Sequence, residues 1–361
     1  MQVKQNDLVS VVLALVVVGT ASCRPSTYAT PSPQEIESSL FLIGDAGEQD
    51  PRDVGVPLDS LTAQASVAPQ RSIIVFLGDN VYESGVPERG TVQYPDARRR
   101  MEDQVRAVPA GVRAIFLPGN HDWGQEEADG LFAIRRQGEL IDQLAQERDI
   151  EMLPRNGCPG PVSIDIGRLR LIALDTQWWL QDYIVHDSAS HCAQMTTGDV
   201  TAALRRDVRA PGTHRVVVVA GHHPLMTGGV HGGYCGVTGP FRRFAGRTQD
   251  VLSSTNLRMR DSIESAFRGA VPLVYAAGHD HSLQVLRAGN SSPYVLVSGA
   301  GSPEKASCVV RLRESLYTSP HRSGFMRLDI MRGGGVLLRV FRFTSSGSGG
   351  VAYSHWLEPL P

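Results

Sequence analysis

Ile73-Ile-Val-Phe-Leu-Gly-Asp-Asn-Val-Tyr82 joins a run of strand-forming apolar residues to a glycine and then to side chains that bind metals. The glycine lets the chain turn sharply off the predicted strand and brings backbone close to a bound ligand. Four further stretches repeat the pattern, with Gly directly before the first Asp, Asn or His: Phe41-Leu-Ile-Gly-Asp45, Ala114-Ile-Phe-Leu-Pro-Gly-Asn-His-Asp122, Val216-Val-Val-Val-Ala-Gly-His-His-Pro224 and Val274-Tyr-Ala-Ala-Gly-His-Asp-His281. Ligands bind beyond the carboxyl ends of strands in open α/β sheets, so the five stretches predict one shared site.

The side chains of these stretches and the composition of the chain narrow the class of site. Asp, Asn, His and Tyr gathered at one sheet edge are ligands for hard or borderline metals. The chain has 361 residues and a formal net charge of -2. This near-neutral balance argues against nucleic acid or a membrane surface as an electrostatic partner.

The order of the predicted elements indicates an α/β fold. Predicted strands at about 40–44, 73–77 and 113–117 alternate with helical patterns at about 93–107 and 130–147, which implies βαβ units. After His281 the pattern is strands only, which predicts an antiparallel C-terminal half. We therefore expect two sheets packed face to face.

The five clusters, in this order, resemble the calcineurin-like metallophosphoesterases, and within them the small, single-domain purple acid phosphatases. Gly47 stands two places after Asp45, where many members of the superfamily have a His. Tyr82 lies three residues after Asp79, where purple acid phosphatases place a ligating Tyr. The resemblance covers about residues 39–300 and implies a four-layer α/β/β/α sandwich of two mixed sheets flanked by helices.

The resemblance implies two metal ions that share one carboxylate. The first would be Fe(III), because the Tyr82 phenolate is a hard donor. The second would be divalent Fe, Zn or Mn. The ligands carried over to this sequence are Asp45, Asp79, Tyr82 and His281 for the first ion, and Asp79, Asn120, His222 and His279 for the second.

The same resemblance implies a phosphoric ester hydrolase. Two such metals lower the pKa of a bound water, so that a hydroxide attacks a small-molecule phosphomonoester. His121 would act as general acid toward the leaving group, and Asp122 would orient it. His231 would be a second histidine that contacts substrate, whereas His223 is interpreted as a supporting or core residue.

Other functions remain open at this point. One alternative keeps the fold but hydrolyses phosphodiesters or nucleotide pyrophosphates, with Mn or Zn in both sites. A second is a non-catalytic or redox protein that retains a dinuclear centre. Because fold-level likeness transfers reaction class better than substrate, the natural substrate is not predicted.

The N-terminus predicts export. Residues 8–19 are apolar or small, too few to span a bilayer but typical of a signal-peptide core. Thr20-Ala-Ser-Cys23 resembles a bacterial lipobox, with Thr20 in place of the usual Leu. We expect a signal peptide at 1–23, a Pro/Ser-rich tether at 24–37 and one domain at 38–361. The protein would be a monomeric lipoprotein of a bacterial cell envelope, whose only membrane contact is a lipid on Cys23, or otherwise a periplasmic or secreted protein.

Four further cysteines favour two disulfide bonds. An even number of cysteines in an exported chain is typical of disulfide pairing. Three pairings are possible, and the sequence does not choose among them. The four are Cys158, Cys192, Cys235 and Cys308.

Overall fold

The computed structural model describes most of the chain beyond the predicted signal segment. The described residues are 31–48, 56–125, 129–181, 191–210, 216–236, 239, 242, 247–289, 292–344 and 346–358. The predicted signal peptide 1–23, with Cys23, and residues 24–30 of the predicted tether lie outside them. Within these ranges, every helix is too short or too polar to cross a membrane.

The first sheet has seven strands and joins the two ends of the domain. Its strand order is β14-β13-β12-β1-β2-β3-β4. Strands β1 to β4 are parallel, and β12 pairs antiparallel with β1. The bounds are β1 Ile36–Ile43, β2 Ser72–Phe76, β3 Arg113–Phe116, β4 Ile150–Met152, β12 Ser323–Met331, β13 Val336–Phe343 and β14 Gly349–Leu357.

The second sheet also has seven strands, in the order β11-β9-β10-β8-β7-β6-β5. Strands β6, β7, β8 and β10 are parallel, whereas β5, β9 and β11 pair antiparallel with their neighbours. The bounds are β5 Val162–Ile166, β6 Leu169–Ala173, β7 Val216–Ala220, β8 Val274–Ala277, β9 Leu283–Leu286, β10 Tyr294–Ser298 and β11 Ser315–Ser319. Both sheets are therefore mixed, as expected.

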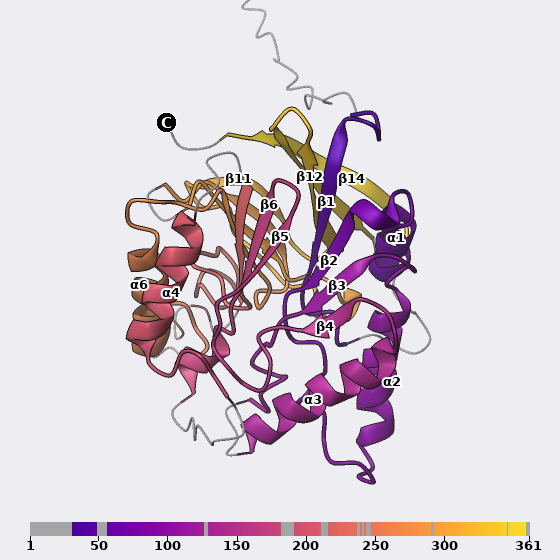
Figure 1. Cartoon of the computed structure of the whole chain (residues 1–361), viewed down its shortest axis with the longest axis vertical. Helices are drawn as coiled ribbons and strands as arrows, with labels where there is room; N and C mark the ends of the chain where they lie inside the picture. Colours follow the sequence, from indigo (N-terminus) through magenta and orange to yellow (C-terminus); the bar gives the residue numbers. More distant parts are fainter. Residues whose placement is uncertain are drawn as a thin grey trace, which may run out of the picture.

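Helices cover the outer face of each sheet, which completes the predicted four-layer sandwich (Figure 1). One apolar core lies between the sheets, a second between the first sheet and its helices, and a third between the second sheet and its helices. The helices on the first sheet are α1 Val56–Ala65, α2 Tyr94–Arg106 and α3 Gly130–Ala145; those on the second are α4 Thr197–Arg209 and α6 Ser254–Ala266.

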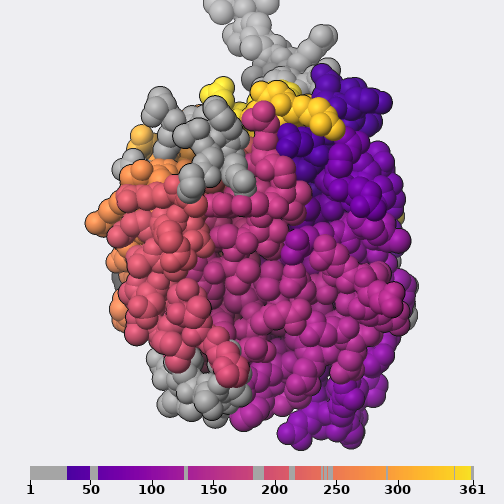
Figure 2. All heavy atoms as spheres, in the orientation of Figure 1, coloured from indigo at the N-terminus to yellow at the C-terminus, as the bar shows by residue number. Residues whose placement is uncertain are grey.

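Burial on both faces explains why the strands with the five motifs are continuous apolar runs. In β2, Ile73 and Val75 face the core between the sheets, while Ile74 and Phe76 face the helices. A strand buried on both sides has no polar face and shows no alternation. Figure 2 shows the N-terminal and C-terminal strands side by side at the upper end, in indigo and yellow, in agreement with the β1–β12 pairing.

Two helices and two strands, α1, α6, β4 and β11, were not predicted from the sequence. Helix α1 buries only Leu58 and Leu61 as large apolar residues, and α6 buries Asn256 within its inner stripe, so their apolar periodicity is weak. Strand β4 has three residues, and three of the five residues of β11 are Ser or Thr. Neighbouring strands, rather than their own sequence, hold these two in place.

Candidate metal centre

The five glycine turns come together at one end of the sandwich. Three follow the adjacent parallel strands β1, β2 and β3, and two follow β7 and β8 of the other sheet. The two sheets are joined there, because Gly44 N donates to Ser298 O at 2.8 Å. Residues far apart in the sequence therefore meet in one cluster.

Close packing explains two of the glycines. A Cβ on Gly119 would collide with the Asp79 carboxylate, and one on Gly278 would lie 2.5 Å from Asp45 Oδ2. Three predicted ligands themselves have positive φ: Asp45 at 58°, Asp79 at 54° and His279 at 66°. Residues other than glycine rarely adopt a positive φ. Those that do concentrate at functional sites.

The first predicted ligand group surrounds the Tyr82 hydroxyl. Tyr82 Oη lies 3.2 Å from Asp45 Oδ1, 3.3 Å from Asp79 Oδ2 and 3.2 Å from His281 Nε2. Asp45 Oδ1 and His281 Nε2 are 3.3 Å apart. Four potential donor atoms therefore converge.

The second group forms around Asn120. Its Oδ1 lies 3.0 Å from both His222 Nε2 and His279 Nδ1, and the two histidine nitrogens are 3.2 Å apart. His222 Nε2 also lies 3.3 Å from Asp79 Oδ2. Asp79 Oδ2 thus belongs to both groups.

These spacings fit metal ions. Donor atoms held about 2.0–2.2 Å from one ion lie roughly 2.8–3.6 Å from one another in tetrahedral or octahedral geometry. The observed separations of 3.0–3.3 Å fall inside that interval. The residues could therefore hold two metal ions that share Asp79.

Backbone carbonyls fix which nitrogen each histidine offers. His222 Nδ1 lies 2.8 Å from Leu77 O, which leaves its Nε2 for the site. His279 Nε2 lies 3.0 Å from Gln249 O, which leaves its Nδ1. Such partners orient metal-binding imidazoles and set their tautomer.

His223 lies beside the second group but is held by other residues. Its Nδ1 is 2.9 Å from Thr176 Oγ1, and its Nε2 is 2.7 Å from Gln249 Oε1. Burial, and then the charge of His222, lower its pKa well below the ordinary value. Both ring nitrogens of His223 therefore have protein partners, and neither is left to bind a metal.

The protein alone disfavours charge on Tyr82. Burial, and then Asp45 and Asp79, raise the pKa of the phenol well above its ordinary value. Burial lowers the pKa of His222, but the charge of Asp79, its hydrogen bond and the charge of Asp45 together outweigh burial and bring the pKa to about 9. A cation beside Tyr82 would reverse the first effect.

His121 lies at the edge of the first group. Its ring packs on Tyr82 with centroids 4.2 Å apart, and its Nε2 is 3.9 Å from Asp79 Oδ2. Its Nδ1 lies 2.5 Å from Glu83 O and 2.9 Å from Gln125 Nε2. The Nε2 edge is thereby turned toward the shared carboxylate.

The contacts of Asp122 differ from those expected of a residue that orients His121. Its oxygens accept from the backbone of Gly119, Asn80 and Val81, and from Asn80 Nδ2. Asp122 therefore ties together the loops after β2 and β3. Glu83 O and Gln125, which carry no motif, hold the His121 ring instead.

His231 lies beside the second group. Its ring packs on that of His279 with centroids 4.0 Å apart. Its Nδ1 is 3.0 Å from Asp250 Oδ1, and its backbone N donates to Asp280 Oδ1 at 3.3 Å. The loop that carries His231 thus borders the site.

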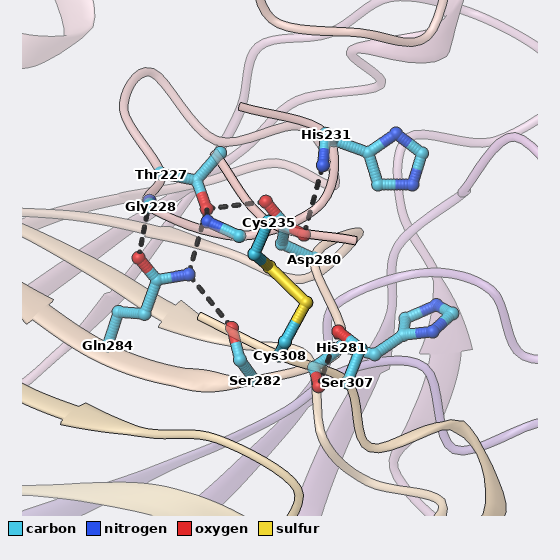
Figure 3. Close-up of a disulfide and its surroundings, with 11 residues drawn as sticks. Thr227, Gly228, His231, Cys235, Asp280, His281, Ser282, Gln284, Ser307 and Cys308 are labelled. Carbon is cyan, nitrogen blue, oxygen red and sulfur yellow. Dashed lines mark hydrogen bonds between the residues drawn. A yellow bond between two sulfur atoms is a disulfide. The ribbon is translucent and has the colours of Figure 1, made fainter. Parts of the chain in front are cut away.

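The His231 loop is fastened to the segment that carries His279 and His281 (Figure 3). Gln284 Oε1 accepts from Gly228 N at 2.8 Å, and Thr227 Oγ1 donates to Asp280 Oδ2. Figure 3 shows the rings of His231 and His281 projecting to the same side of a nearby disulfide.

Two disulfides settle the cysteine pairing. Cys158 bonds to Cys192, and Cys235 bonds to Cys308. The second joins the His231 loop to Cys308. The neighbouring residue, Ser307, donates its backbone N to His281 O at 2.7 Å. Two disulfides were expected, but their partners were not predicted.

Comparisons with known proteins agree with this geometry. A family model described as calcineurin-like phosphoesterase matches residues 43–283. GAP50, the anchor in the inner membrane complex of Plasmodium, superposes with a TM-score of 0.58 at 16% identity, covering 90% of each chain. No curated protein matches the sequence of this chain.

A purple acid phosphatase is also structurally similar. The enzyme PPD1 from seeds of yellow lupin (Lupinus luteus) superposes with a TM-score of 0.55 at 14% identity. The alignment covers 88% of this chain and 53% of that one, so this chain spans about half the length of the lupin structure. At such identities the likeness concerns the fold.

Proposed function

The chain belongs to the calcineurin-like phosphoesterase family, and on that premise we propose that it is a metal-dependent phosphomonoesterase of the purple acid phosphatase type. The observation that carries the proposal is the position of Asp79 Oδ2, 3.3 Å from both Tyr82 Oη and His222 Nε2. One carboxylate oxygen thus joins the two groups of donors. A small phosphate ester is the proposed substrate.

Two bound metals would supply an activated water and neutralise phosphoryl charge. Asp45, Tyr82 and His281 would hold one ion, Asn120, His222 and His279 the other, and Asp79 both. The side chains of Asp45, Asp79 and His222 are at most 2% exposed. Charge interactions among such buried side chains are stronger than in water.

Tyr82 supports Fe(III) in the first group. Its phenol is buried between Asp45 and Asp79, which oppose its ionisation. A phenolate can form there only beside a strongly charged cation, and phenolate oxygen is a hard ligand. The all-N/O second group suits divalent Fe, Zn or Mn.

His121 and His231 each lie beside one of the two groups. His121 packs on Tyr82 of the first, and His231 on His279 of the second. With Nδ1 at Glu83 O, the His121 Nε2 is free to hold a proton for a leaving-group oxygen. With Nδ1 at Asp250, the His231 Nε2 is free to contact a phosphoryl oxygen.

A paired rate assay tests the proposal. The full chain, produced with iron plus zinc or manganese, receives p-nitrophenyl phosphate and bis-p-nitrophenyl phosphate. We expect faster cleavage of the monoester and loss of both activities on chelation. Faster diester cleavage would favour a phosphodiesterase or nucleotide pyrophosphohydrolase instead.

A non-catalytic role is the rival from a different class. GAP50, a structural neighbour, is described as an anchor. The convergence of seven donor residues and the placement of His121 support catalysis over that role. Absence of cleavage with both metals bound would favour the anchor or a redox role.

Export and lipidation are part of the proposal. Two disulfides support an oxidising compartment. The predicted lipobox cysteine, Cys23, would carry the lipid. Labelling of the wild-type chain by fatty acid, lost in Cys23→Ser, is the expected result; equal labelling of both would exclude Cys23 as the attachment site.

A further inference from the structure

Two arginines face each other across strands of the first sheet, far from the metal centre. Arg327 of β12 and Arg339 of β13 are directly opposite in the strand register. Each is 8% exposed. Like charges directly opposite in a sheet destabilise it, and buried arginines need anionic partners.

The structure describes one carboxylate on this pair, that of Asp329. Arg327 Nε donates to Asp329 Oδ1 at 2.7 Å, and Arg339 Nη2 pairs with Asp329 Oδ2. Asp329 is fully buried and also accepts from Ser39 Oγ at 2.6 Å. Two positive charges therefore share one negative charge.

The contacts of the two guanidinium groups are unequal. Each nitrogen of Arg327 has a partner, because its Nη1 also donates to Gln64 Oε1 at 3.2 Å and its Nη2 to Ser39 Oγ at 3.1 Å, which leaves the second N–H of Nη1 and of Nη2 for another acceptor. Arg339 Nε is buried without a hydrogen-bond partner among the described residues. The proximity of Arg339 also adds to the burial that lowers the pKa of Arg327.

Two further carboxylates, next to Ile36 in the sequence, have other partners. Glu35 accepts from Ser32 N at 2.8 Å, and Glu37 pairs with Arg168 at 3.3 Å. A third cation, Arg71, approaches from the helical side and donates to Ile36 O at 2.7 Å. The local charge is therefore positive.

A cavity of about 180 Å³ opens beside these arginines. Arg71, Arg327 and Arg339 line its charged side. Apolar walls come from the segment before β1, the first residue of β1 and the loop after α1; they are Pro31, Pro33, Ile36, Val67 and Ala68. A cavity with a cationic side and apolar walls complements an anion that carries a short apolar group.

We propose that this cavity binds a small carboxylate with a short aliphatic tail, whose carboxylate completes the charge balance of Arg327 and Arg339. Arginine suits this ligand because its planar fork donates two parallel bonds to a carboxylate. The cavity is separated from the metal centre along β1, because the strand rises about 13 Å from Ser39 at the cavity to Ile43, and Asp45 lies beyond the end of the strand. It is a second site, independent of the catalytic proposal.

Gln64 offers a sharp test, because its Oε1 already touches Arg327. Gln64→Glu adds the missing carboxylate at nearly constant shape. Without ligand this variant should unfold at a higher temperature than the wild type, and it should no longer respond to a carboxylate. Gln143→Glu is the matched control, because Gln143 Oε1 accepts from Arg89 at 2.7 Å on an exposed surface.

The probe is butanoate, followed by thermal unfolding of the full chain at constant ionic strength. A saturable rise in the unfolding temperature is expected for the wild type and for Gln143→Glu, and none for butan-1-ol. Arg339→Met should weaken butanoate binding by about tenfold or more, the scale of one charge-assisted contact. Arg342→Met, an exposed position on the same strand, should keep wild-type binding.

Two outcomes would overturn the proposal. One is a wild-type response to butanoate no larger than the response to the same concentration of chloride. The other is a Gln64→Glu variant that still responds as the wild type does. Should Arg339→Met fail to fold, the Gln64→Glu and Gln143→Glu pair decides alone.

Discussion

Asp79 Oδ2 lies 3.3 Å from His222 Nε2, although the two residues come from different sheets. The same oxygen lies 3.3 Å from Tyr82 Oη. This oxygen therefore belongs to both donor groups. The predictions about metal binding depend on that shared position.

Asp79→Asn should remove metal from both groups. The amide replaces a shared anionic oxygen with a neutral atom, so more than half of the bound metal is lost and ester hydrolysis falls to background. Elemental analysis of the purified variant checks this. Asp142→Asn, at an exposed ion pair with Arg155, should retain full metal content. Two metals per chain in Asp79→Asn would contradict a bridging role.

Tyr82→Phe should abolish any purple colour of the iron-loaded protein and leave the fold intact. The change deletes the Oη that contacts Asp45, Asp79 and His281, while the ring can still pack on His121. Visible absorption and circular dichroism measure the two effects. Colour that survives would exclude Tyr82 as an iron ligand.

His121→Ala should keep both metals and lose about 10²–10⁴-fold in rate, the usual span for general acid catalysis. The loss should be larger for phenyl phosphate than for p-nitrophenyl phosphate, because the poorer leaving group needs the proton more. Equal turnover of phenyl phosphate by variant and wild type would rule out the acid role. Metal content serves as the control for an intact site.

Asp175 should make stability depend on pH. Burial raises its pKa to about 7 from an ordinary 3.8. Between those values the folded protein keeps a proton that the unfolded chain has lost, so the free energy of unfolding falls as pH rises from about 4 to 7.

The Asp175→Asn variant removes this titration and should show a smaller fall. Asp122, whose pKa burial and Asp79 also raise to about 7, keeps part of the dependence. Urea unfolding at pH 5 and pH 8 measures the difference. An unchanged difference would mean that Asp175 is ionised in the folded protein.

Cys235→Ser/Cys308→Ser should lower the free energy of unfolding by about 2–4 kcal/mol, the typical value of a disulfide. It should also raise KM, because the bond fastens the loop of His231 beside the metal groups. Cys158→Ser/Cys192→Ser is the control for stability alone. An unchanged KM in the first variant would show that hydrogen bonds to Asp280 and Gln284 suffice to place the loop.

The five strands that lead to the site, and the meeting of the residues that follow them, were predictable because each of these strands is followed by a glycine and a polar side chain, a signal confined to adjacent residues. Leu77 O, Glu83 O and Gln249 O were not predictable, since any residue type supplies a carbonyl. Gln125 and Asp250 were missed because each reaches its histidine from a loop without a motif. The disulfide partners depend on distance in space, which spacing along the chain does not reveal.

Each sheet supplies part of the donor set: Asp45, Asp79, Tyr82 and Asn120 follow strands of the first, and His222, His279 and His281 follow strands of the second. If both groups bind metal, metal occupancy and the docking of the sheets would form one linked equilibrium, so that a change that separates the sheets would also release the ions. A cavity made deep in the shared core, for instance at Leu296, would weaken metal binding without touching a ligand. The metals would then hold the two sheets together, and their affinity would measure the stability of the packing between the sheets.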